Sequence, residues 1–230
     1  MKAAVLYERR AQLIVEDVDL KPPAPDEVRI RVKAAGVCHS DYHHWEGEFG
    51  STLPLVLGHE VAGVVDAVGT GVTRVRSGDR VVLAFGYRCG ECFYCLKGEP
   101  YICTPSPDWP VLKRFPRLSK NGRGINSFLA VGAFAEYTIV PATNVIPLPN
   151  DVPFEVGALV GCAVATGFGA VANAAKVLPG SSVLVIGCGG VGLNVIQAAS
   201  LVGAARIIAV DIRDNKLKYA RQFGATHSRA

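Results

Sequence analysis

The sequence predicts an α/β protein with two parts, a β-rich region over residues 1–152 and a region of helices and buried parallel strands over residues 153–230. Three observations support this division. Short apolar runs separated by many glycines and prolines fill the first region, as in a small barrel or sandwich. A glycine-rich turn joins an apolar strand to a helix in the second. Four cysteines lie together in one short stretch of the first.

Four strands are predicted in the first region. Residues 28–32 alternate apolar and charged side chains, which is typical of a half-buried strand. Residues 61–68 are rich in valine and alanine, and residues 81–83 follow a turn of the type Ser-Gly-Asp. A further strand is expected at residues 135–140.

The second region begins after a group of prolines, Pro147, Pro149 and Pro153, which favours a domain boundary. Residues 156–175 carry no charge and could be mistaken for a membrane span. Their many glycines and alanines have little transfer energy, so we expect buried helices and no membrane segment. With half of all residues hydrophobic and 19% charged, the chain has the composition of a packed globular protein.

A strand–turn–helix–strand unit follows, with strands predicted at residues 183–186 and 207–210 and a helix at residues 191–202. The turn has the spacing of the dinucleotide-binding motif, in which the helix N-terminus faces the pyrophosphate. A glycine turn with a purely structural role is the alternative. An acid 19 residues after the last glycine can bind both hydroxyls of the adenosine ribose and repel a 2′-phosphate, which favours NAD over NADP. The predicted cofactor-binding residues of this unit are Gly187, Gly189, Gly190, Val191, Gly192 and Asp211.

The four clustered cysteines are Cys89, Cys92, Cys95 and Cys103. Four thiolates this close in sequence can surround one tetrahedral zinc ion and hold together a loop that has little core of its own. The alternatives are an iron–sulfur cluster, disulfides, or unligated thiols. Iron–sulfur ligation fits the first three spacings but not the seven-residue gap before Cys103, and cysteines two residues apart are poorly placed for a disulfide.

Two compositional features bear on the surroundings of the protein. The chain has seven cysteines and no apolar secretory signal, and thiolate ligands need a reducing compartment, so we expect a cytoplasmic protein. The net charge is only +4, and the one basic cluster lies among prolines and glycines, as a solvated loop would. We therefore expect no nucleic-acid partner. The cluster comprises Lys113, Arg114, Arg117, Lys120 and Arg123.

Three further residues, Cys38, His59 and Cys162, are too far apart for their spacing to indicate a site. Together with the cysteine stretch, the Gly-His-Glu segment at His59 and the GCGGVG turn, however, they make the chain resemble the zinc-dependent medium-chain alcohol dehydrogenases over essentially its whole length. The resemblance implies a GroES-like β-barrel domain followed by a partial Rossmann domain. It also implies two zinc ions, NAD, an alcohol or aldehyde as small-molecule partner, and a homo-oligomer for a full-length form.

The resemblance also implies roles for single residues. Cys38, His59 and Cys162 match the ligands of a catalytic zinc, Glu60 matches a residue beside it that transiently replaces a ligand, and Asp41 matches the carboxylate that orients His59. Ser40 matches the hydroxyl that accepts the alcohol's proton, and His43 matches the histidine that ends the proton relay; neighbouring His44 is the alternative for this role. The positions implied to contact the cofactor are His39 at the pyrophosphate, Thr166 at the nicotinamide and Lys216 at the adenosine ribose.

The chain ends where a third strand of the dinucleotide fold should begin, so we expect only two of the usual six strands, with open sheet edges, in a fragment of a longer protein. Residues 104–131 are expected to form a long loop, a weak sign of an enzyme for primary or aromatic alcohols or formaldehyde adducts. Three functions compete: an alcohol dehydrogenase, a non-catalytic zinc-binding remnant or half-protein, and a polyol or formaldehyde-adduct dehydrogenase of the same family.

Overall fold

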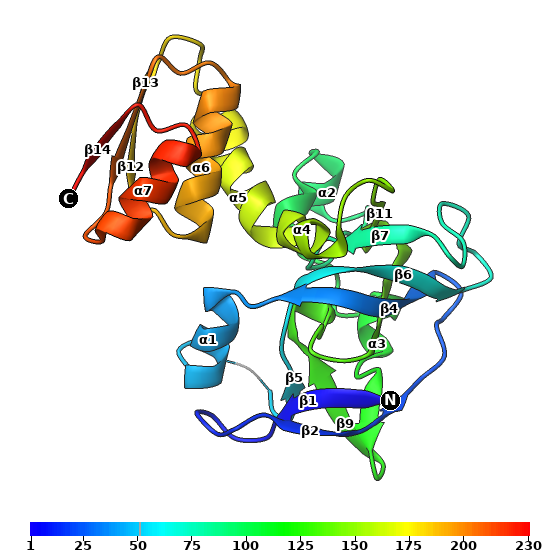
Figure 1. Ribbon diagram of the computed structural model, residues 1–230. Coiled ribbons are helices and arrows are strands. Elements are labelled where there is room, and N and C mark those ends of the chain that lie inside the picture. Colours follow the sequence, from blue (N-terminus) through cyan, green and yellow to red (C-terminus); the bar gives the residue numbers. More distant parts are fainter. Residues whose placement is uncertain (51) are drawn as a thin grey trace. The chain divides into compact units, whose positions relative to one another are not determined.

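The computed structural model describes residues 1–50 and 52–230. The chain divides into two compact units, Met1–Gly161 and Cys162–Ala230, and each is described by itself. The predicted boundary at residues 152 and 153 precedes this division, because the first helix after the prolines packs on the strands of the first unit. Figure 1 shows the strands and helices of each unit.

A five-stranded antiparallel sheet forms one side of the first unit, and it contains all four predicted strands. Its core is built largely from valine side chains of neighbouring strands, since β-branched residues pack well on a pleated surface. The strands, in the order of the sheet, are β10 (Tyr137–Pro141), β4 (Glu27–Gly36), β6 (Glu60–Val68), β7 (Arg80–Leu83) and β11 (Val145–Pro147).

A second sheet completes a nearly closed barrel, which confirms the predicted β-barrel domain. Backbone hydrogen bonds from Ala4 to Phe134 and from Glu136 to Lys2 join its strand β1 to the segment that enters β10. The strands of this sheet, in order, are β2 (Ile14–Asp17), β1 (Lys2–Leu6), β5 (Leu55–Val56), β9 (Arg123–Ser127), β8 (Leu118–Lys120) and β3 (Asp19–Leu20).

The prediction of a long loop over residues 104–131 was wrong. This segment contains the short helix α3 (Pro110–Lys113) and the antiparallel pair β8–β9, which are internal strands of the six-stranded sheet. The strands are three and five residues long and carry polar side chains, so their sequence lacks a clear alternation.

The basic cluster of this segment is only partly solvated. Lys113 and Arg123 are exposed, as expected of a solvated loop. Arg117 is buried and forms an ion pair with Glu27, which is itself 1% exposed. Arg114 pairs with Asp26, and Lys120 pairs with Glu16. Acidic partners therefore neutralise part of the positive charge of this cluster.

The remaining helices of the first unit are short. Those near the predicted ligands are α1 (His39–Glu46), α2 (Phe93–Leu96), the 3₁₀ helix Pro100–Ile102 and α4 (Phe154–Leu159). Two further 3₁₀ helices, Phe128–Ala130 and Ala142–Asn144, lie in the connections between barrel strands. Helix α4 packs on β4, β6 and β7 and continues without a break into the π-helical segment Val160–Val164.

The second unit confirms the predicted strand–helix–strand order and adds a strand that the sequence analysis missed. A parallel sheet of three strands, not two, has the order β12-β13-β14, because the last residues pair with β13. The missed strand is only three residues long. The elements are α5 (Ala165–Gly169), the π-helical segment Ala170–Ala174, β12 (Ser182–Ile186), α6 (Gly190–Leu201), β13 (Arg206–Val210), α7 (Asp214–Gln222) and β14 (His227–Arg229).

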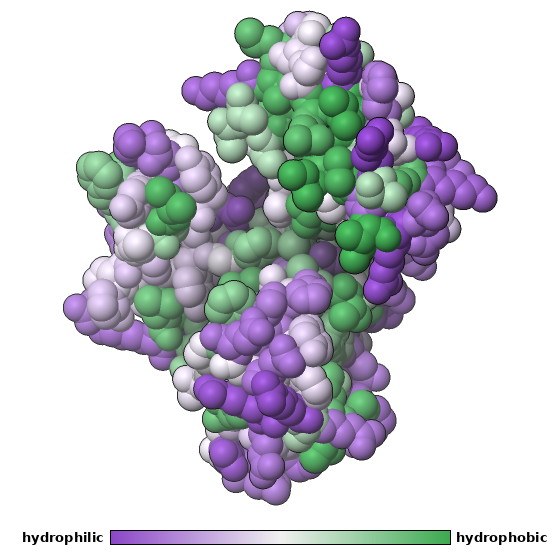
Figure 2. Space-filling view, turned by 90° about the vertical axis from the view of Figure 1, so that its left-hand side faces the viewer, coloured by the Kyte–Doolittle hydropathy of each residue, from purple (hydrophilic) through white to green (hydrophobic). Residues whose placement is uncertain are grey.

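One face of this parallel sheet remains uncovered within the second unit. Leu184 is 58% exposed and Ile186 is 79% exposed, whereas Val185 between them is buried. Apolar side chains are accordingly visible on the surface of this unit in Figure 2. Parallel sheets are ordinarily covered on both faces, so the open edges expected from the sequence are accompanied by an open apolar face.

One helical segment among the described residues, Phe154–Ala174, is long and apolar enough to cross a membrane by length and composition alone. Core helices of soluble proteins pass the same test, and the first turns of this segment pack on barrel strands. The expectation of core helices and no membrane segment stays a prediction.

The buried Glu27–Arg117 pair yields a stability prediction. Replacing Glu27 by Gln removes the negative charge and leaves a buried guanidinium without its partner, which should lower the free energy of unfolding by about 3 kcal/mol. The control is Asp17→Asn, whose ion pair with Lys2 is exposed and should contribute less than about 1 kcal/mol. Urea unfolding monitored by circular dichroism measures both, and equal losses would contradict the assignment.

Candidate metal centres and nucleotide turn

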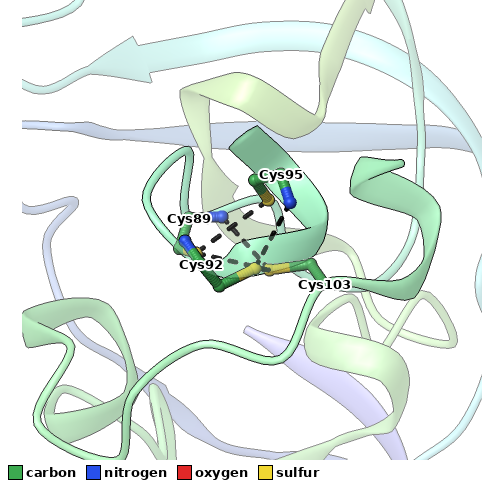
Figure 3. Close-up of side chains that lie close together, drawn as sticks. All are labelled: Cys89, Cys92, Cys95 and Cys103. Carbon is green, nitrogen blue, oxygen red and sulfur yellow. Dashed lines mark hydrogen bonds between the residues drawn. The ribbon is translucent and has the colours of Figure 1, made fainter. Parts of the chain in front are cut away.

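The four clustered cysteines converge on one point in the first unit (Figure 3). Helix α2 begins at Cys92 and carries Cys95, while Cys103 follows the 3₁₀ helix Pro100–Ile102. The measured Sγ–Sγ distances are 3.5 Å for Cys89–Cys103, 3.9 Å for Cys92–Cys103 and 4.0 Å for Cys89–Cys95. Sulfurs bound tetrahedrally at a Zn–S distance of about 2.3 Å lie about 3.8 Å apart, so the cluster fits a zinc ion.

Backbone amides already stabilise negative charge on these sulfurs. The N–H of Cys95 points at the sulfur of Cys92 and lowers the pKa of that thiol to about 6. The N–H groups of Cys89 and Cys92 point at the sulfurs of Cys103 and Cys89. Burial instead raises the pKa of Cys103 to about 12, and hydrogen bonds with the side chains of the other three cysteines act in the same direction.

A second cluster gathers the donor atoms of Cys38, His59, Glu60 and Cys162 within 4.8 Å of one another. Two thiols, an imidazole and a carboxylate suit a tetrahedral zinc ion. Cys38 stands at the start of α1, His59 and Glu60 at the start of β6, and Cys162 directly after Gly161 on the helix that continues from α4. The spacing of these residues in the sequence does not predict that they lie together.

Asp41 fixes two of these donors. Its carboxylate accepts hydrogen bonds from the backbone N–H of Cys38 at 3.0 Å and of Gly58 at 2.9 Å, and it lies 3.3 Å from Nδ1 of His59. Asp41 is 3% exposed and His59 is 1% exposed. When Nδ1–H donates to Asp41, the lone pair for a metal is on Nε2, which is the orientation expected of a ligating histidine.

Sequence reasoning missed the aromatic rings around His59. Phe85 and Phe128 each pack edge-to-face against the imidazole, with ring centroids 5.3 Å away. Gly36 was missed too: a Cβ there would lie 2.0 Å from Oε2 of Glu60, so only glycine leaves room for that carboxylate. No sequence pattern distinguishes these phenylalanines from other core residues.

The predicted relay residues all lie on α1. Ser40 is half-buried in its first turn, and His39 is exposed at its start. Nδ1 of His43 contacts Oε2 of Glu48, while the ring of His44 packs against Phe128 with centroids 4.2 Å apart. Burial lowers the pKa of His44. The roles of Ser40, His39 and His43 stay predictions.

In the second unit the glycine turn has the predicted local geometry. Gly187 has φ of +92°, and a Cβ at Gly192 would lie 1.9 Å from the carbonyl oxygen of Gly187, so helix α6 and strand β12 approach too closely for a side chain there. A Cβ at Gly189 would meet nothing within 4 Å, which leaves the turn open to a ligand. Gly190 and Val191 begin α6 and are exposed.

Asp211 is held beside this turn. Its carboxylate accepts hydrogen bonds from the N–H of Cys188 at 2.7 Å and of Arg213 at 3.0 Å. These bonds, led by the one from Cys188, lower the pKa of Asp211, and the nearby charge of Lys216 acts in the same direction. Thr166 is exposed on α5. The cofactor roles of Thr166 and Lys216 stay predictions.

Two family models match the chain. The alcohol dehydrogenase GroES-like domain matches residues 24–150, and the zinc-binding dehydrogenase domain matches residues 190–228. The chain belongs to the zinc-dependent medium-chain alcohol dehydrogenase family. Cys₂His is the ligand set that alcohol dehydrogenases use for a catalytic zinc.

Individual relatives support the same assignment. The chain is 41% identical to alcohol dehydrogenase 6 of Rattus norvegicus over 98% of its own length and 61% of that protein. Among solved structures, it is similar to a zinc-binding alcohol dehydrogenase domain protein from Burkholderia ambifaria (TM-score 0.92, 36% identity, covering 99% of this chain and 63% of that one). Benzyl alcohol dehydrogenase from Acinetobacter calcoaceticus gives a TM-score of 0.90 at 37% identity, covering 99% and 62%. The chain therefore spans somewhat under two thirds of the length of these relatives.

The contacts of Asp41 predict a selective loss of metal. In Asp41→Asn one oxygen becomes an amide NH₂ and can no longer accept, so the side chain loses either the bond from Cys38, which goes to Oδ2, or the contacts with Gly58 and His59, which go to Oδ1. Zinc affinity at the Cys38–His59 centre should fall about 10- to 100-fold, while the four-cysteine centre keeps its zinc. Chelator competition measures both. Asp79→Asn, which changes an exposed Asp that accepts from the N–H of Arg76, is the control and should lose neither zinc.

Proposed function

We propose that the chain is the zinc-binding part of an oxidoreductase that transfers a hydride between an alcohol, primary or aromatic, and NAD, giving an aldehyde or ketone. The observation that carries this proposal is the convergence of Cys38, His59 and Cys162, from three distant segments, within 4.8 Å. With Glu60 turned away from the ion, the three remaining donors would leave a fourth tetrahedral position for a substrate oxygen, as a catalytic zinc requires and a structural zinc does not.

The ligands divide between two zinc ions. Cys38, His59 and Cys162 would hold the catalytic ion, with Glu60 beside it, and the cluster of Cys89, Cys92, Cys95 and Cys103 would hold a structural one. A bound zinc would lower the pKa of the alcohol hydroxyl, and NAD would take up the hydride from its carbinol carbon.

The proton of the alcohol would leave through side chains of α1. The hydroxyl of Ser40 accepts it first, and His43 passes it towards solvent. The contact between His43 Nδ1 and Glu48 supports this order, because a nearby carboxylate can orient the ring.

Several residues would contact the cofactor. The turn from Gly187 to Gly192 would bind the pyrophosphate, and Asp211 and Lys216 would bind the adenosine ribose. We also propose the pyrophosphate as the ligand of His39 and the nicotinamide as the ligand of Thr166. Related structures hold different nicotinamide cofactors, NADH in a protein from E. coli CFT073 and NADP in one from Sinorhizobium meliloti. The ionised carboxylate of Asp211 favours NAD for this chain.

A second candidate, a polyol dehydrogenase, is favoured by similarity to galactitol-1-phosphate dehydrogenase from Escherichia coli, at 31% identity and a TM-score of 0.82. Similarity to a benzyl alcohol dehydrogenase is somewhat higher. Kinetics with benzyl alcohol, sugar alcohols and S-hydroxymethyl thiols separate these candidates.

We also propose the compartment, the partners and the oligomeric state of the protein. The cysteines of both centres are not joined in disulfides, which suits the reducing cytoplasm. The internal pairing of Arg114, Arg117 and Lys120 supports the absence of a nucleic-acid partner. We place the apolar segment Phe154–Ala174 in the protein core and not in a membrane, and we expect a full-length form to be a homo-oligomer.

Replacement of a catalytic ligand tests the proposal. In a full-length version, Cys38→Ser should lower alcohol-dependent NADH formation at least 1,000-fold, an order-of-magnitude expectation for removing a metal ligand from a zinc-activated reaction. Val37→Ala, at the neighbouring residue that is 82% exposed, should retain activity. Retained activity in Cys38→Ser would refute the catalytic centre, and no alcohol-dependent NADH from the unaltered protein would favour a non-catalytic zinc-binding module.

Cofactor preference gives a separate test. Asp211→Ser removes the charge that repels a 2′-phosphate and should raise NADP affinity relative to NAD at least tenfold, since like charges about 4 Å apart repel by a few kcal/mol. Because the pKa of Asp211 is lowered, the unaltered protein should prefer NAD even below the ordinary pKa of aspartate. Fluorescence titration measures both affinities. Asp214→Ser, an exposed acid in the first turn of α7, should not change the ratio.

A further inference from the structure

Cys162 differs from the other donors of its cluster because it lies in the interior of a helical segment, whereas Cys38 caps the start of α1 and His59 and Glu60 lie at the start of β6. The helix starts as α4 and becomes π-helical over Val160–Val164, where Cys162 lies 8% exposed. Widened turns of this kind are found mostly at functional sites. The position of the Cys162 sulfur therefore depends on how this helix is seated on the barrel.

Strand β7 contacts both ends of that helix. At one end, Arg80 reaches the residues that begin α4. At the other, a Cβ on Gly161 would lie 2.6 Å from the carbonyl oxygen of Leu83, so the backbone immediately before Cys162 rests on the last residue of β7. From Arg80 to Leu83, strand β7 rises by three residues, or about 10 Å. From Phe154 to Gly161, the helix rises by seven residues, or about 10.5 Å. The strand and the helix are therefore matched in length.

The close fit continues between these ends. A Cβ on Gly157 would lie 2.8 Å from Leu148 and 3.2 Å from the Cβ of Ala62 on β6. Glycine at positions 157 and 161 brings the helix backbone against the sheet. Close packing at these two glycines leaves little room for the helix to move away from the sheet, so contacts at its first turn help to set where it lies along its axis.

Arg80 makes contacts of this kind. Its guanidinium lies over the ring of Phe154, 3.9 Å from the centroid, and donates a hydrogen bond from Nη2 to the carbonyl oxygen of Val152. Its Nε is buried and has no hydrogen-bond partner among the described residues. A partly desolvated cation over an aromatic ring contributes more than an exposed one and fixes the ring in place. The carbonyl of Arg80 also accepts from the N–H of Leu148 at 2.8 Å.

We propose that Arg80 is a positioning residue for the catalytic zinc centre: by clamping Val152 and Phe154 it sets the axial position of α4 and so brings the Cys162 thiolate to Cys38 and His59. The inference rests on the proposed function, because it assumes that these three residues bind zinc. It concerns metal affinity, which can be measured without catalysis.

The test measures both zinc affinities of the 230-residue chain by chelator competition. Arg80→Met keeps the length of the side chain and removes the guanidinium; it should weaken the Cys38–His59–Cys162 zinc at least tenfold and leave the four-cysteine zinc unchanged. Arg76→Met, at an arginine whose side chain is 90% exposed on the preceding turn, is the control and should change neither. Cys38→Ser identifies which affinity belongs to which centre.

A second variant separates positioning from general stability. Phe154→Leu removes the ring under Arg80, so its effect on zinc affinity and that of Arg80→Met should be non-additive in the double variant. In the cobalt-substituted protein, Arg80→Met should also shift the absorption bands of the Cys₂His site and not those of the four-cysteine site.

Each other result overturns the inference. Unchanged affinity in Arg80→Met, equal weakening of both zinc ions, or additive effects in the double variant would show that Arg80 does not position Cys162. If the unaltered chain bound only the four-cysteine zinc, the proposed function would fail first, and this inference with it. If the unaltered chain bound two zinc ions and Arg80→Met left both zinc affinities unchanged, this inference would fail and the proposed function would stand.

Discussion

The buried carboxylate of Asp41 is the constraint on which the candidate centre depends. Burying an ionised carboxylate costs several kcal/mol unless donors satisfy it, and Asp41 has three: two backbone amides and an imidazole. These donors come from the start of α1 and from the turn before β6. Satisfying Asp41 therefore fixes Cys38 and His59 relative to each other before any metal is bound, so that little reorganisation is left to the binding step.

The two metal clusters differ in how much of them the sequence reveals. The four cysteines lie within fifteen residues and two of them flank one turn of helix, so local spacing is enough to predict them. The other cluster requires the register of the barrel. Gly36 pairs with Glu60 where strands β4 and β6 lie side by side. The register between these two strands shifts at two places, and the alternation of residues in the sequence does not indicate either shift. Only the resemblance to a family supplied those ligands in advance.

The errors of sequence reasoning share a cause. Strands β8, β9 and β14 are short and partly polar, and their neighbours in the sheet, more than their own composition, make them strands. Arg117 seemed solvated because its acid partner, Glu27, lies 90 residues away along the chain. The long elements β4, β6 and α6 were predicted well because each satisfies its own periodicity.

The different spans of the clusters also set an order of assembly during synthesis. All four thiols of the Cys89–Cys103 cluster emerge from the ribosome almost together, and the closure of such short loops costs little entropy. This cluster can capture zinc on a nascent chain whose barrel is still open. The cluster that contains Cys38 can form only after Cys162, more than a hundred residues later, has been synthesised and helix α4 has packed on the barrel. Zinc can therefore bind to the first cluster once residue 103 has been synthesised, whereas zinc can bind to the second only after the barrel has folded.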